Sequence, residues 1–83
     1  MTLDRDAVFK QLQAIGGRLT PGIDWSLKLP ALRALIRDGD TLSVLGQSLE
    51  TKALIEAEMS EGNTAPELTD LLQLIERDIR PHV

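Results

Sequence analysis

Residues 40–62 read DTLSVLGQSLETKALIEAEMSEG, and the rest of the chain is organised around this stretch. Asp40 and Thr41 are suitable N-cap residues, because their side-chain oxygens can accept hydrogen bonds from the free N–H groups of a first helical turn. Gly62 can end a helix in the left-handed conformation. We therefore predict a long helix between these two ends.

The predicted helix is apolar on two nearly opposite faces. One face repeats at three- and four-residue steps through Leu42, Leu45, Leu49 and Ala53. The other face holds Val44, Ile55 and Met59. Because a surface helix normally has one apolar stripe, we expect both faces to be covered, the first by the core and the second by a partner.

Gly46 lies inside the same predicted helix, where glycine costs about 1 kcal/mol relative to alanine. It either allows a close crossing with another helix or divides the helix, so that Ser48 caps a second part. The sequence leaves both interpretations open.

Two further helices are predicted in the part of the chain that precedes this stretch. The first is predicted from a cap at Thr2 or Asp4 to about Ile15, with Gly16-Gly17 as its end. Its apolar stripe consists of Val8, Leu12 and Ile15. The second is predicted over residues 31–38, with Leu32, Leu35 and Ile36 on its core face.

The last predicted helix begins at a capping box, in which Thr64 caps the first turn and Glu67 reaches back. It continues to about Ile79, before Pro81. Its apolar stripe consists of Leu68, Leu71, Leu72, Ile75 and Ile79. Leu74 lies off this stripe, so we expect it either in a minor contact or on a partner surface.

Residues 23–29 are ambiguous. Apolar side chains alternate with polar ones, which is typical of a strand. A second strand to pair with it is missing, so we favour a short helical turn capped by Asp24. The sequence therefore predicts one all-α domain over residues 1–83, a small bundle of four helices or, with this turn, five.

Composition limits the chemistry of this domain. The chain of 83 residues has no cysteine and a single histidine, His82, which excludes disulfides and thiolate metal sites. A Ser-His or Cys-His nucleophile system is not recognisable. We therefore expect no enzymatic activity, no cofactor and no bound metal.

Charge and hydropathy narrow the location and the partners. The N-terminal residues have no apolar signal segment, and no run reaches the roughly 20 apolar residues that span a bilayer, so we expect a cytoplasmic protein without membrane contact. The first 37 residues hold six basic and three acidic residues, whereas the remainder holds three basic and ten acidic ones. An acidic helix after the turn at Gly39 disfavours binding to nucleic acid.

The apolar excess indicates a protein–protein interaction module, such as an adaptor, a small chaperone or a regulator, that forms a homodimer. The expected interface residues are Trp25, Val44, Leu54, Ile55, Met59 and Leu74. Two alternatives remain. The first is a DNA-binding regulator with a helix-turn-helix around Gly39, and the second is an acidic decoy of a nucleic-acid-binding protein.

Overall fold

The computed structural model describes residues 2–83, which form a helical bundle without a strand. The α-helices are α1 (Arg5–Arg18), α2 (Ile23–Ser26), α3 (Leu29–Asp38), α4 (Thr41–Ser60) and α5 (Pro66–Leu74). A π-helical segment, Ile75–Ile79, and a 3-10 turn, Arg80–His82, continue α5. Within the described residues, none of these helices has both the length and the apolar character needed to cross a bilayer.

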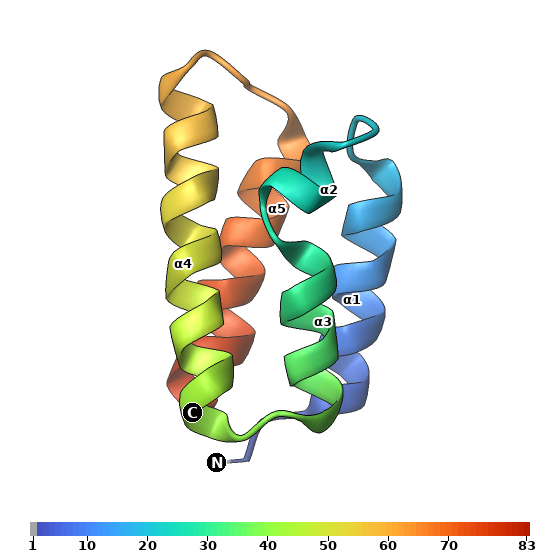
Figure 1. The fold of residues 1–83 in the computed structure, drawn as a ribbon, viewed down its shortest axis with the longest axis vertical. Helices are drawn as coiled ribbons and strands as arrows, with labels where there is room; N and C mark the ends of the chain where they lie inside the picture. Colours follow the sequence, from blue (N-terminus) through green and yellow to red (C-terminus); the bar gives the residue numbers. More distant parts are fainter. Residues whose placement is uncertain (1) are drawn as a thin grey trace.

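The four long helices run alternately up and down, and each packs against two neighbours (Figure 1). The ring runs from α1 to α3, then to α4, to α5 and back to α1, and α2 covers the end where α1 turns into α3. The predicted all-α bundle is confirmed, including its fifth short helix over part of residues 23–29. The predicted cap at Asp24 is wrong, because α2 begins at Ile23 after Gly22 and Asp24 lies in its first turn. The molecule measures 35 × 20 × 17 Å.

All four long helices contribute to one apolar core. The loops between the helices are short, so successive helices lie side by side and their apolar stripes face one another. The buried apolar side chains are Val8, Leu12, Ile15, Leu27, Leu29, Leu32, Ile36, Val44, Ile55, Leu68, Leu71, Leu74, Ile75 and Ile79.

Both ends of α4 form as the sequence predicts. An Asp40 carboxylate oxygen accepts a hydrogen bond from the backbone N–H of Ser43 at 3.2 Å. Hydrogen bonds from the Ser43 side chain and backbone lower the pKa of Asp40, because they favour its charged form. At the other end Gly62 adopts the left-handed conformation, with φ +100°, and the chain leaves the helix there. Asp4 caps α1 in the same way through Ala7.

The predicted end of α1 at Gly16-Gly17 is wrong, because the helix continues to Arg18. Gly16 serves a close approach between helices instead. A Cβ atom there would lie 3.2 Å from the Arg33 guanidinium and 3.9 Å from Leu29, both on α3. The left-handed residue of this corner is Gly22, with φ +91°.

The predicted capping box of the last helix is also wrong. Among residues 2–83 no side chain caps the first turn of α5, and Thr64 is exposed. Asn63 organises the corner instead. Its Oδ1 accepts from the N–H of Ala65 at 3.0 Å, and its Nδ2 donates to Glu58 at 3.2 Å. The local Asx turn therefore competes successfully with the box.

The stripe of α5 is centred one residue away from its predicted position. Leu74 is buried and Leu72 is half-buried, the reverse of the prediction. Leu71 lies at the centre of the buried arc, and Leu68 and Leu74 lie three residues to either side of it. Pro81 follows the π-helical segment; proline has no N–H and its ring crowds the carbonyl four residues earlier, which disfavours a regular α-helix there.

Arg5 links the beginning of α1 to the end of α3. Its Nη1 donates to the carbonyl oxygens of Ile36 at 2.9 Å and Leu35 at 3.3 Å. These carbonyls belong to the last turn of α3, at the negative end of the helix dipole, and the Leu35 carbonyl also accepts from the backbone N–H of Gly39 at 2.7 Å. Arg5 therefore acts as a C-cap that comes from another helix.

Candidate functional site

The outward side of α4 is apolar. We call it the outer stripe and define it as Leu42, Leu45, Gly46, Leu49 and Ala53. Leu42 and Leu49 expose 77% and 42% of their surface and, with Trp25, are the exposed large apolar residues of the described chain. Leu45 is half-buried, and Gly46 and Ala53 are exposed. The helix therefore presents leucine to solvent along its first three turns.

The inward side of α4 is more polar than the outer stripe. Val44 and Ile55 are fully buried, but so are Ser48 and Thr51, which lie between them on the same face. The Thr51 hydroxyl donates to the carbonyl of Gln47 at 2.8 Å. The Ser48 hydroxyl is buried and has no hydrogen-bond partner among residues 2–83. The small side chains of Ser48 and Thr51 allow α4 to pack closely on the bundle at the cost of apolar burial.

The two faces of α4 are thus assigned the wrong way round in the sequence-based prediction. Val44 and Ile55, expected at an interface, have no exposed surface, and Leu74 exposes only 1%. Leu54 and Met59 are partly buried and pack against the core. The face expected in the core is the outer stripe.

Trp25 is the residue of the expected interface set that the structure leaves at the surface, with 72% of its surface exposed. It lies on α2, three residues before Lys28. The Lys28 ammonium pairs with the carboxylate of Glu50 on α4. This ion pair places Lys28, at the α2–α3 corner, beside the residue that follows Leu49.

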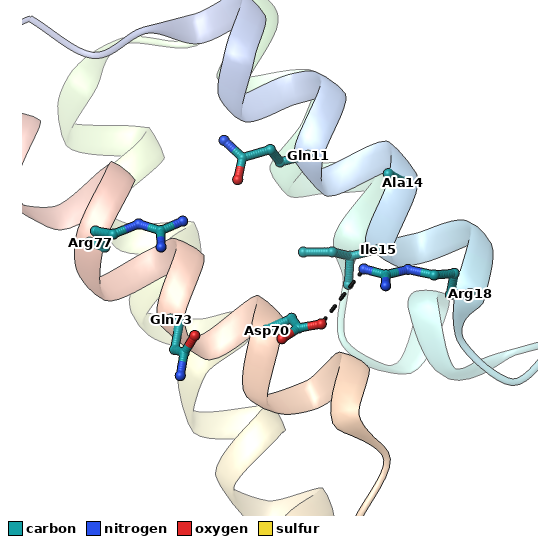
Figure 2. Close-up of a pocket in the computed structure, with 7 residues that line it drawn as sticks. All are labelled: Gln11, Ala14, Ile15, Arg18, Asp70, Gln73 and Arg77. Carbon is teal, nitrogen blue, oxygen red and sulfur yellow. Dashed lines mark ion pairs between the residues drawn. The ribbon is translucent and has the colours of Figure 1, made fainter.

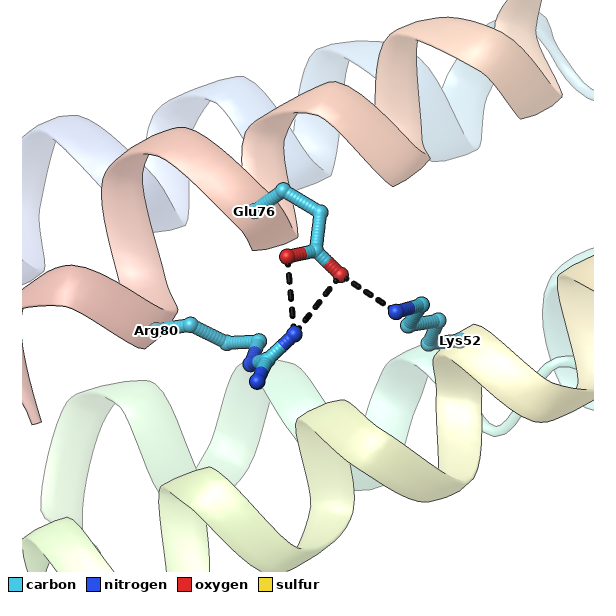
Figure 3. A network of polar contacts seen from close by, with 3 residues as sticks. All are labelled: Lys52, Glu76 and Arg80. Atoms are coloured by element: carbon cyan, nitrogen blue, oxygen red, sulfur yellow. Dashed lines mark hydrogen bonds and ion pairs between the residues drawn. The ribbon is translucent and has the colours of Figure 1, made fainter.

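Charged residues on the other flank of α4 are neutralised within the chain. Lys52 Nζ lies 2.8 Å from a Glu76 carboxylate oxygen, and Arg80 Nη1 lies 2.8 Å from the other oxygen (Figure 3). These contacts, with the Lys52 hydrogen bond as the largest cause, lower the pKa of Glu76. With Lys28 and Glu50 on the α3 side, ion pairs border the stripe on both flanks, as in the polar rim of an interface.

A polar cleft of about 270 Å³ lies between α1 and the α5 end of the chain (Figure 2). Arg18 and Asp70 form an ion pair of 3.7 Å across it. The remaining lining residues are Gln11, Ala14, Ile15, Gln73 and Arg77. Exposed arginine and glutamine side chains of this kind are typical of a solvated groove, and no nucleophile next to a general base lines the cleft.

The single histidine lies near a second, smaller cleft. His82 and Asp78 line it from the C-terminal end, and Thr2 and Asp4 line it from the N-terminal end. The Nδ1 atom of His82 is buried without a hydrogen-bond partner in the described chain. Within residues 2–83 no group of three or more potential ligands is arranged to hold a metal ion.

In comparisons with known proteins, no family model, curated protein or solved structure matches the chain significantly.

Proposed function

We propose that the protein is a non-enzymatic protein–protein interaction module that forms a homodimer through the outer stripe of α4. The observation that supports this proposal is the polarity of α4, which buries Ser48 and Thr51 while it exposes Leu42 and Leu49. A helix selected only for the fold of a monomer would carry leucine inside. A dimeric adaptor, small chaperone or regulator is the class of protein that this arrangement fits.

The size of the chain supports self-association. A chain of 83 residues buries a smaller share of its surface than larger domains do, so an additional apolar interface stabilises it substantially. Monomeric proteins rarely expose large contiguous apolar patches. The lack of cysteine further supports a cytoplasmic setting.

The test compares an aspartate on the outer stripe with an aspartate on a different helix. We expect light scattering to give twice the single-chain mass of 9.1 kDa for the unmodified protein at tens of micromolar. Ala53→Asp should reduce this to the single-chain mass, because two buried carboxylates would face an apolar surface. Ala14→Asp, at an exposed alanine of α1, is the matched control and should remain dimeric.

One further variant on the outer stripe and one in the core complete the experiment. Leu49→Asp should remain helical and become monomeric, whereas Ile55→Asp should unfold the chain, because Ile55 is fully buried. A mass of 9.1 kDa for the unmodified protein at this concentration would contradict the proposal.

A further inference from the structure

The outer stripe alternates large and small residues in a way that fits its own copy. Leu42 and the half-buried Leu45 are followed by Gly46, and Leu49 is followed by Ala53, so protruding side chains and hollows succeed one another along one face. The structure of a single chain does not require the hollow at Gly46. A Cβ atom there would meet no atom of residues 2–83 within 4 Å. Glycine nevertheless costs about 1 kcal/mol relative to alanine inside a helix.

We infer that the partner is a second copy of this chain whose α4 runs antiparallel to the first, with the two-fold axis between Gln47 and Ser48. This inference rests on the proposed homodimer. In this arrangement Leu49 of each copy lies against Gly46 of the other, and Leu42 lies against Ala53. An isologous pairing requires this reciprocity, in which each contact occurs twice. Small residues at the contact also let the two helix axes approach closely.

A parallel pairing fits the same stripe less well. Identical positions would face each other, so that leucine would meet leucine and Gly46 would meet Gly46. The first contact would be crowded and the second would leave a void, and both cost stability. The carboxylates of Glu56 would also face each other, since Glu56 lies one turn beyond the stripe.

The antiparallel arrangement keeps the two Glu56 carboxylates apart, one at each end of the seam. Glu56 is exposed in the single chain and lies near the C-terminal end of the stripe. With the axis between Gln47 and Ser48, Glu56 is level with Gly39 of the other copy, between Asp38 and Asp40. Asp40 already caps the positive end of the helix dipole there, so the dipole offers Glu56 no net attraction. Glu50 and Lys52 are already paired with Lys28 and Glu76, so they add no uncompensated charge to the seam.

The size of the interface sets the expected affinity. α4 has 20 residues and is therefore about 30 Å long, and the stripe covers about half of that length. Such a pair of helices is smaller than a standard interface, so we expect a dissociation constant on the order of micromolar.

Cross-linking distinguishes the two arrangements, because the chain contains no cysteine of its own. Positions 42 and 53 are 11 residues apart, about 16 Å along a helix. A disulfide needs Cα atoms within about 7 Å. Leu42→Cys and Ala53→Cys proteins, one of them tagged to give a different mass, should therefore form a mixed disulfide when oxidised together. Each protein oxidised alone should stay uncross-linked.

A substitution that fills the hollow at Gly46 provides a second test of the antiparallel pairing. Gly46→Leu should weaken dimerisation about tenfold or more, because the extra side chain overlaps Leu49 of the other copy. Gly17→Leu is the matched control, since Gly17 is also an exposed helical glycine with nothing within 4 Å in residues 2–83. Circular dichroism should show that both variants remain helical. A Gly46→Leu protein that dimerises as tightly as the unmodified chain would overturn the inference.

The remaining outcomes separate this inference from the proposed function. Disulfides within each single variant, but not between them, would show a parallel dimer, which overturns the inference and leaves the proposed homodimer intact. Equal cross-linking of all combinations would mean that no defined pairing exists, which also overturns it. A mass of 9.1 kDa together with no cross-link would contradict the homodimer itself, and would leave the outer stripe for a different protein.

Discussion

Replacing Ser48 by alanine should stabilise the protein, although Ser48 is fully buried in the bundle. Its hydroxyl has no hydrogen-bond partner among residues 2–83. A buried hydroxyl without a partner costs about 1–3 kcal/mol in proteins. Alanine is also the better helix former, by about 0.5 kcal/mol, and the loss of one oxygen atom leaves little empty space. We therefore expect Ser48→Ala to raise the free energy of unfolding by about 1–3 kcal/mol.

For a domain of this size each 1 kcal/mol shifts the melting temperature by about 4–8 °C, so the variant should melt at least about 4 °C higher. Thermal and urea unfolding followed by circular dichroism measure this, at one fixed concentration because dimerisation makes the melting temperature depend on it. Ser60→Ala, an exposed serine in the last turn of α4, is the control for helix propensity. If Ser48→Ala melts at or below this control, the hydroxyl has a partner in solution and the reasoning fails.

Two further predictions follow from the helix ends and from α5. Leu74→Ala should cost about 2–5 kcal/mol because Leu74 is buried, and half-buried Leu72→Ala should cost less; equal urea midpoints would contradict this order. Hydrogen bonds from Ser43 hold the pKa of Asp40 below its ordinary value of 3.8, so its contribution to stability is present above that pH and is lost as the pH falls through the folded value. Asp40→Asn keeps a capping oxygen without this titration and should lose less stability than the unmodified protein between about pH 5 and pH 2.

The helices could be predicted from the sequence because their signals are local. Asp4, Asp40 and Gly62 act within one turn of their own position, and the three- and four-residue repeats of α1 and α3 each define one buried face. The absence of a second strand pattern was sufficient to favour a helical turn in residues 23–29. Local competition explains the error at Thr64, where Asn63 offered an alternative turn of similar strength.

The orientation of α4 could not be predicted from its own sequence. Both faces are apolar, so periodicity alone does not tell which one meets the bundle. Ser48 and Thr51 were the available signal, since small residues permit close packing, but a polar pair usually indicates the exposed side. The candidate surface was therefore sought around Ile55 and Met59, and only Trp25 of the expected set is strongly exposed.

The ring of helices has a consequence for the order of folding. α1 with α3, α3 with α4, and α4 with α5 are pairs that follow one another along the chain, so hairpins of adjacent helices can form early at little entropic cost. Bundles dominated by such local contacts fold within microseconds to milliseconds. The contact of α1 with α5 joins distant parts of the sequence and should form last. Side chains along that seam, such as Ile15, should consequently control how long the folded state persists more than how quickly it is reached.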